Sequence, residues 1–108
     1  MTTAVTTADP VLARYRAALT ALYGDRIERV VLFGSRARGD ATPDSDYDVA
    51  LFFKDLTDTW QEIDRLVELQ VAMLDATGAD IHTMPFPAQG WVERTPLMHE
   101  IRKDGVDL

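Results

Sequence analysis

One stretch decides the fold of this chain: residues 33–53, which read 33-FGSRARGDATPDSDYDVALFF-53. It ends one apolar run, residues 27–33 (IERVVLF), and contains a second, residues 47–53 (YDVALFF), and both are rich in residues that favour strands. Between them, residues 35–39 suit one short helical turn, and residues 40–45 (DATPDS) are turn-forming throughout. The connection of about a dozen residues is too short for an ordinary crossover helix, so we predict an antiparallel or mixed pair of buried strands.

Two helices are predicted near the ends of the chain. The first covers residues 9–24, where Asp-Pro gives a capping carboxylate and a proline at the first helical position, and a glycine caps the end. The last covers residues 95–103, begins with Thr-Pro and stops before Gly105. Trp91, shortly before it, is either a contact for a partner or a core residue that closes this helix onto the sheet. The residues that we expect these helices to bury are Val11, Leu12, Tyr15, Ala18, Leu19 and Leu22 in the first and Leu97, Met98 and Ile101 in the last.

A central helix and a third strand complete the predicted fold. A capping box, Thr59-x-x-Glu62, begins the helix, which runs to about Ala76 and is closed by a glycine. Residues 79–84 (ADIHTM) form the third strand, and the prolines at 85 and 87 stop it. The result is an α/β (α+β) protein, a small mixed β-sheet with helices packed on it. The apolar residues that we expect the central helix to bury are Trp60, Ile63, Val67, Val71 and Leu74.

The composition fits one small domain. The chain has 108 residues, of which 46% are hydrophobic and 27% charged, and no cysteine, so it has neither a disulfide framework nor a thiolate metal site. We expect residues 1–8 to be disordered and residues 9–108 to form a single domain. The first residues lack the regions of a signal peptide and no apolar run is long enough for a membrane span, so we expect a cytoplasmic protein without a membrane partner.

The net charge of −7 argues against a broad nucleic-acid surface, which needs a basic face. A negative chain is compatible with a basic protein partner, with a metal site built from carboxylates, or with solubility alone.

Asp46 and Asp48 are the first candidates for chemistry. Side chains alternate along a strand, so these two share one face, with backbones about 7 Å apart. Two buried, ionised carboxylates repel each other unless a cation lies between them, and magnesium takes carboxylate and phosphate oxygens as ligands. The pair therefore predicts a metal–phosphate site, although an Asp-x-Asp at the start of a strand often only caps a turn or pairs with an arginine such as Arg36 or Arg38.

Gly34 and Ser35 strengthen that prediction. A glycine and a hydroxyl between a strand and a helical turn expose N–H groups to an anion and let the backbone approach a phosphate closely. If Gly34 and Ser35 hold a triphosphate, Asp46 and Asp48 at the start of the next strand are placed to hold its metal.

The spacing Gly-Ser-x10-Asp-x-Asp, from Gly34 to Asp48, resembles the minimal nucleotidyltransferase (MNT) family of the DNA polymerase beta-like superfamily. The resemblance extends over most of the chain and includes the ending TPLMHEIRKDG. It implies the polymerase beta-like nucleotidyltransferase fold, and a third acidic residue on a later strand, for which Asp80 is in the matching place. Without the resemblance, we would interpret Asp80 as a surface residue that follows the glycine cap of the central helix.

The residues around the motif have expected roles of their own. One arginine is expected on the triphosphate and the other on the turn, through Asp40 or Asp44, while Ser45 orders that turn. His82 shares the strand face of Asp80, but we expect a partly buried histidine with satisfied hydrogen bonds and leave it out of the site. The implied site comprises Asp46, Asp48 and Asp80 as catalytic and metal-binding residues and Gly34, Ser35, Arg36 and Arg38 as nucleotide-binding residues.

The implied reaction is nucleotidyl transfer from ATP with two magnesium ions, in which an acceptor hydroxyl attacks the α-phosphorus and pyrophosphate leaves. MNT proteins commonly pair with a helical HEPN-domain protein, a ribonuclease toxin, and some neutralise it by adding AMP to a tyrosine. The leading hypothesis is therefore a magnesium-dependent, AMP-transferring antitoxin with a HEPN toxin as its partner. The alternatives are an antitoxin that acts by complex formation alone and a transferase for a small molecule such as an aminoglycoside.

Overall fold

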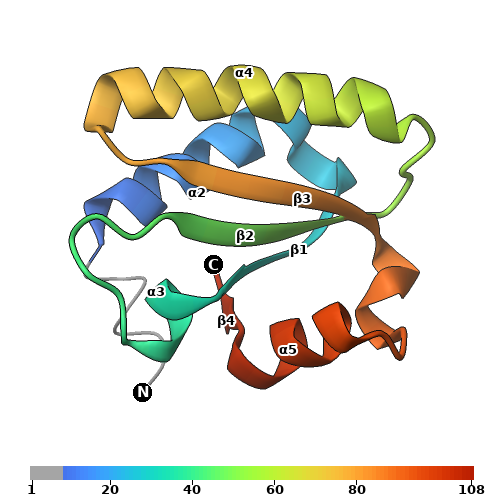
Figure 1. The fold of residues 1–108 in the computed structure, drawn as a ribbon. Coiled ribbons are helices and arrows are strands. Elements are labelled where there is room, and N and C mark those ends of the chain that lie inside the picture. The colour runs from blue at the N-terminus through green and yellow to red at the C-terminus, as the bar shows by residue number, and fades with distance from the viewer. Residues whose placement is uncertain (1–8) are drawn as a thin grey trace.

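A four-stranded mixed sheet with the strand order β3-β2-β1-β4 lies at the centre of the protein (Figure 1). The structure is a computed structural model and describes residues 9–108, so the disorder expected for residues 1–8 lies outside the described part. β1 pairs with β2 and β4 in antiparallel fashion, and β2 pairs with β3 in parallel, which confirms the predicted mixed sheet. The strands are β1 (Ile27–Phe33), β2 (Tyr47–Phe53), β3 (Ile81–Pro87) and β4 (Val106–Asp107).

Helices cover both faces of this sheet. Figure 1 views the sheet nearly edge-on, with α2 and α4 on one side and α5 on the other, next to the short α3. None of the helices in the described part of the chain is both long enough and apolar enough to span a membrane. The helices are α2 (Pro10–Tyr23), α3 (Ser35–Arg38), α4 (Thr59–Thr77) and α5 (Pro96–Asp104), and two 3-10 turns cover Gly24–Arg26 and Ala88–Val92.

β2 divides its side chains between two cores, as the alternation of a strand requires. Val49, Leu51 and Phe53 face the core under α2 and α4. Ala50 and Phe52 face the smaller core under α5. Asp48 has the same parity as Ala50 and Phe52, so its side chain lies on the α5 side of the sheet, where that core ends.

The predicted start of α4 is wrong by one residue. Asp58, not Thr59, is the N-cap, and its Oδ1 accepts the backbone N–H of Gln61 at 3.0 Å. Glu62 does not complete a capping box. It is only 2% exposed, and its carboxylate accepts Arg26 Nη2 at 2.9 Å and Arg65 Nη1 at 3.5 Å.

The face that α4 buries also differs from the prediction. The helix turns Glu62, Leu66 and Met73 into the core. The apolar residues at helical spacing that we expected to be buried lie largely outside: Trp60 is 77% exposed, Val67 51%, Val71 53% and Leu74 44%, and Ile63 is half-buried. In α2, Leu22 is likewise exposed, whereas Tyr23 takes its place in the core.

β3 continues through Pro85 and Pro87, which we expected to stop it. Because β3 is at the edge of the sheet and pairs only with β2, a missing N–H on its open side breaks no ladder. β4 was not predicted, since two residues carry no periodic signal.

Trp91 is half-buried and packs against the smaller core, as expected for a residue that closes the last helix onto the sheet. Its ring packs edge-on against Phe52 at 5.5 Å between centroids, and the Arg29 guanidinium lies 4.1 Å from the Trp91 ring. These contacts close α5 and the preceding turn onto the sheet.

Candidate active site

Three segments that are distant in the sequence meet at one end of the sheet. β1 ends where the antiparallel β2 begins, so Phe33 pairs with Asp48. β3 runs parallel to β2, so it begins at the same end: Asp48 pairs with His82, and Tyr47 N–H donates to the Asp80 carbonyl at 2.9 Å. The topology alone therefore brings residues 34, 46, 48 and 80 together.

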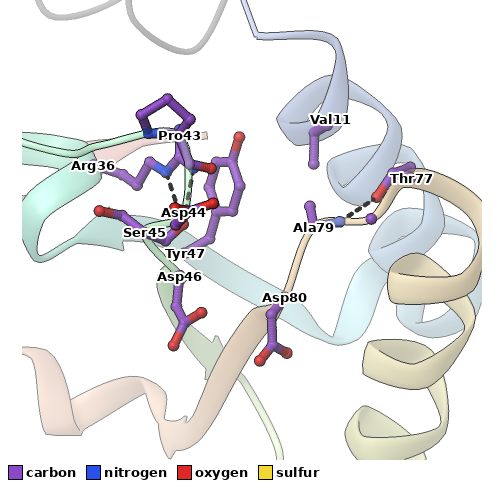
Figure 2. A pocket seen from close by; sticks show the side chains of 11 residues that line it. Val11, Arg36, Pro43, Asp44, Ser45, Asp46, Tyr47, Thr77, Ala79 and Asp80 are labelled. Carbon is purple, nitrogen blue, oxygen red and sulfur yellow. Dashed lines mark hydrogen bonds between the residues drawn. The ribbon is translucent and has the colours of Figure 1, made fainter.

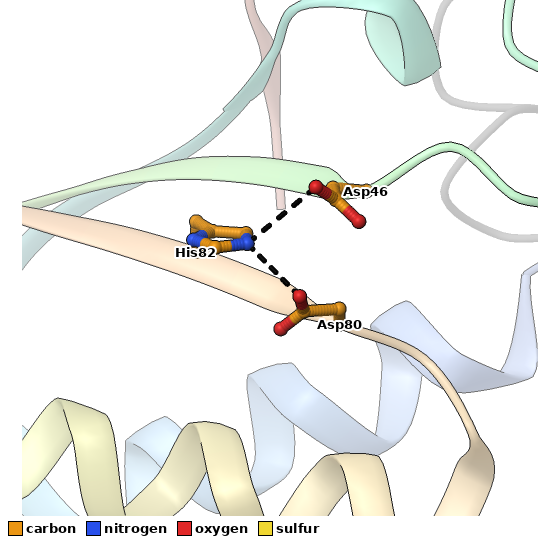
Figure 3. Close-up of side chains that lie close together, drawn as sticks. All are labelled: Asp46, Asp80 and His82. Atoms are coloured by element: carbon orange, nitrogen blue, oxygen red, sulfur yellow. Dashed lines mark hydrogen bonds and ion pairs between the residues drawn. The ribbon is translucent and has the colours of Figure 1, made fainter.

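Asp46, Asp80 and His82 form the centre of this site (Figure 3). One ligand atom from each lies within 4.8 Å of the others. His82 Nε2 is 3.1 Å from Asp80 Oδ2 and 3.6 Å from Asp46 Oδ2. His82 has a hydrogen-bond partner, as expected, but it was wrongly left out of the site: its side chain is 48% exposed and faces both carboxylates. The signal was present in the sequence, since Asp80-x-His82 has the same two-residue spacing as Asp46-x-Asp48.

Asp48 points to a different part of the site. Its carboxylate lies against Gly34, where an added Cβ would be 2.6 Å from Asp48 Oδ2. Burial raises the pKa of Asp48, an effect that nearby Asp46 reinforces and nearby His82 opposes. A carboxylate that is costly to ionise in this position is suited to a cation or to a cationic partner.

Asp80 is held in its ionised form. Gln70 Nε2 on α4 donates to Asp80 Oδ1 at 2.7 Å, and this bond, with a smaller effect of His82, lowers the pKa of Asp80. Gln70 was missed by the sequence analysis because nothing in an amphipathic helix distinguishes a glutamine that faces an aspartate from one that faces water.

Gly34 begins the connection to the turn. It has φ 76° and ψ −158°, a backbone region that is essentially restricted to glycine. Its carbonyl accepts the N–H groups of Ala37 and Arg38 at 3.1 Å each, which starts α3. The half-buried Ser35 follows directly, so the Gly-Ser pair begins at the residue that lies against Asp48. Their contact with phosphate remains a prediction.

The two arginines have different positions. Arg36 holds the turn through carbonyls: its Nη2 donates to Ser45 O at 2.8 Å and Pro43 O at 3.3 Å. Its guanidinium also lies 4.2 Å from the centre of the Tyr47 ring. The expected pairing of one arginine with Asp40 is made by Arg38.

Arg38 is partly exposed and pairs with acids. Its Nε donates to Asp40 at 3.2 Å, and Nη1 approaches Glu100 and Asp104 of α5 at 3.7 and 3.8 Å. The turn itself is ordered as predicted, with Ser45 Oγ accepting the N–H of Thr42 at 2.9 Å.

A pocket of about 400 Å³ opens beside Asp46 and Asp80 (Figure 2). The start of α2, the end of α4 and the turn around Ser45 form its walls. Asp48, Gly34 and Ser35 are outside its lining, so the site has two sides: a glycine–carboxylate side and a pocket side, with Asp46 and Asp80 between them. The pocket is within the range of sizes of small-molecule sites.

The donor set fits a divalent cation. Asp46 and Asp80 offer carboxylate oxygens from neighbouring strands, with His82 as a third ligand, and Asp48 faces the same end of the sheet. Oxygen-rich sets of this kind are typical of magnesium and manganese sites. A carboxylate set that holds divalent cations is suited to metal-assisted phosphoryl- or nucleotidyl-transfer chemistry.

The sequence profile of the family "Polymerase beta, Nucleotidyltransferase" matches residues 19–108. This chain belongs to that family, and its fold is the nucleotidyltransferase fold that the motif predicted.

Individual relatives agree with this assignment. A Methanocaldococcus jannaschii protein that bears the provisional name protein adenylyltransferase is 26% identical over 98 residues, which are 91% of this chain and 95% of that protein. A crystal structure of a toxin–antitoxin with AMP-PNP has a TM-score of 0.63 at 22% identity, covering 87% of this chain and 69% of that chain.

A structure of the tri-AMPylated Shewanella oneidensis HEPN toxin in complex with MNT antitoxin has a TM-score of 0.56 at 19% identity, covering 99% of this chain and 71% of that chain. At these identities the two structures support the fold.

Proposed function

We propose that this chain is an antitoxin that transfers AMP from ATP to a tyrosine hydroxyl of a cognate HEPN ribonuclease toxin and thereby neutralises it. The observation that carries the proposal is the meeting of Asp46, Asp48 and Asp80 beside Gly34. The family match supports nucleotidyl transfer. A relative named as a protein adenylyltransferase and a fold neighbour solved with an AMPylated HEPN toxin support a protein acceptor.

In this proposal Asp46, Asp48 and Asp80 bind magnesium, two ions in all. The carboxylates supply the hard oxygen ligands that magnesium prefers. When bound, the ions would offset the negative charge of the triphosphate and lower the pKa of the acceptor hydroxyl.

The residues of the chain then bind and orient the substrates. Gly34 and Ser35 bind the phosphates, Arg38 supplies a guanidinium to them, and Arg36 fixes the turn that carries Asp46. The pocket beside Asp46 and Asp80 has room for the acceptor side chain.

The transfer forms a bond between the acceptor oxygen and the α-phosphorus and breaks the bond to the bridging oxygen of the β-phosphate, so that pyrophosphate leaves. Asp80 receives the proton of the hydroxyl. Gln70 supports this step because its hydrogen bond keeps the carboxylate ionised and oriented.

Purified chain, cognate HEPN protein, magnesium and ATP labelled at the α-phosphate provide the test. We expect label on a tyrosine of the HEPN protein, and we expect none with Asp46→Asn or Asp48→Asn or after removal of magnesium by a chelator. Asp25→Asn is the matched control, because Asp25 is an exposed aspartate at the far end of β1.

The other candidate functions give different results in the same assay. Neutralisation of the toxin by the unlabelled complex, unchanged in Asp48→Asn, would support inhibition by complex formation alone. Label on an added aminoglycoside and none on the HEPN protein would support a small-molecule transferase.

A further inference from the structure

The exposed face of α4 is unusual for a small protein. Four large apolar side chains, which we call the α4 stripe, lie along the helix over its whole length: Trp60, Val67, Val71 and Leu74. Their spacing of seven, four and three residues places them on one side of a helix with about 3.6 residues per turn. No part of residues 9–108 covers them, and the core face of α4 lies elsewhere, at Leu66 and Met73. Contiguous exposed apolar surface of this kind marks an interaction site.

The charges beside the stripe restrict what can cover it. Asp64, Glu68 and Asp75 are exposed and, by the same helical period, follow one border of the stripe. Two copies of this chain that packed stripe against stripe with antiparallel helices would bring these acids together, and in any arrangement each copy has a net charge of −7. The charge pattern therefore disfavours a second copy and favours a partner with basic residues around an apolar surface.

The opposite border of the stripe lies next to the candidate active site. Gln70 lies on that border and bonds to Asp80 at 2.7 Å. At the end of the helix, the Leu74 carbonyl accepts the N–H of Gly78 at 2.8 Å, and Gly78 lines the pocket beside Asp46 and Asp80. A protein that covers the stripe is thus next to the place where an acceptor must enter. In Figure 1, α4 lies along β3, with its outer side away from the sheet.

We propose that the α4 stripe is the docking surface for the protein acceptor of the transfer, which presents an apolar surface bordered by lysine or arginine. This inference rests on the proposed function, because it takes the HEPN protein as the acceptor. Apolar anchors in the centre of such a surface carry most of the binding energy, and the charged border steers association.

The test measures binding of the cognate HEPN protein by calorimetry without ATP. Val67→Glu/Val71→Glu places two charges in the stripe, and we expect it to weaken binding about 100-fold, as the loss of two central contacts does. Ala72→Glu/Ala76→Glu is the matched control: both alanines are exposed on the same helix, away from the stripe, and we expect binding within about threefold of the wild type. Circular dichroism and ATP affinity, measured on both variants, report that the fold and nucleotide site are intact.

Each outcome decides a different point. If the stripe variant binds the HEPN protein as tightly as the control does and transfers AMP to it equally well, the docking inference is overturned and the proposed function stands. If the stripe variant loses binding but the wild type transfers no AMP, docking stands and the transfer is overturned. A wild type that does not bind the HEPN protein overturns both. A homodimer in light scattering that Val67→Glu/Val71→Glu dissociates would assign the stripe to a second copy and overturn the inference.

Discussion

Asp48 and Gly34 are in such close contact that a methyl group at residue 34 would lie 2.6 Å from Asp48 Oδ2. The pairing of Phe33 with Asp48 across β1 and β2 enforces this approach. The close approach of the Asp48 carboxylate thus requires a glycine at residue 34, independently of any contact with phosphate.

Gly34→Ala should therefore damage both stability and nucleotide binding. A residue with a side chain is strained at φ 76°, and we expect the free energy of unfolding to fall by about 2 kcal/mol. The added methyl also displaces Asp48, so ATP affinity should fall. Gly39→Ala is the control, because Gly39 has φ 86° but open space around an added Cβ. It should lose about 1 kcal/mol and keep its ATP affinity. ATP titration measures the affinity of each variant, and urea unfolding measures its stability. Equal ATP affinities in the two variants would contradict a role of the Gly34–Asp48 contact in nucleotide binding.

Asp48→Asn should stabilise the protein at neutral pH while it abolishes transfer. Burial raises the pKa of Asp48 in the folded protein above its value in the unfolded chain. Its ionisation therefore costs stability above the folded pKa, and this cost disappears as the pH falls below the unfolded pKa of about 4.

Thermal unfolding at several pH values measures this difference. The Tm of Asp48→Asn should exceed that of the wild type at pH 7, and the two should converge in acid. Asp25→Asn, at an exposed site, should match the wild type throughout. A lower Tm for Asp48→Asn at pH 7 would argue that other contacts of the carboxylate outweigh its burial.

The tyrosines should resist ionisation until the protein unfolds. The chain has three; burial raises the pKa of Tyr15 and Tyr47 to about 12 and also raises the pKa of Tyr23. Tyr15 shares a hydrogen bond with Thr83, and Tyr47 donates to Asp9 at 2.7 Å. The neutral, buried hydroxyls contribute their full stabilisation of the fold below the pKa of an unfolded tyrosine, about 10. This stabilisation is lost as the pH rises through the folded pKa of about 12.

Tyrosinate absorbance against pH provides the measurement. In the native protein it should rise in one step that coincides with loss of the circular dichroism signal, whereas in denaturant it should rise near pH 10. Ionisation of any tyrosine near pH 10 while the native signal persists would contradict the burial of that hydroxyl.

Arg26→Ala should destabilise the protein more than loss of an ordinary surface arginine. Arg26 Nη2 lies 2.9 Å from the carboxylate of Glu62, which is almost fully buried. Without Arg26, the remaining ion-pair partner of Glu62 among the described residues is the more distant Arg65, at 3.5 Å. We expect the free energy of unfolding to fall by about 2 kcal/mol, since an unpaired buried charge is costly.

Arg14→Ala, at an exposed position of α2, is the control in urea unfolding and should change stability by less than about 0.5 kcal/mol. Equal losses in the two variants would show that Glu62 does not depend on Arg26.

The strands of the site could be predicted from the sequence because their signals are local. The apolar runs 27–33 and 47–53 are bounded by Gly-Ser and by a dense turn signal, and both strands have the predicted bounds. The short connection predicted an antiparallel or mixed pair, and the antiparallel pairing of β1 with β2 places Gly34 against Asp48.

The orientation of α4 could not be predicted from hydropathy. The helical spacing of Trp60, Val67 and Leu74 identifies an apolar face of the helix but does not tell what covers that face. The face that packs on the sheet carries Glu62. The burial of Glu62 depends on its ion pair with Arg26, which is 36 residues away in the sequence. For the same reason Gln70 could be assigned only when the packing of α4 beside the start of β3 was known.

The prolines of β3 have a consequence for the behaviour of the free protein. β3 is an edge strand beside the active site, and an open edge invites another strand to add to it. Pro85 and Pro87 remove two of the N–H groups that such a strand would need. The edge is therefore a poor template for intermolecular β-sheet growth, so the strand that carries His82 is protected from aggregation along its own sheet.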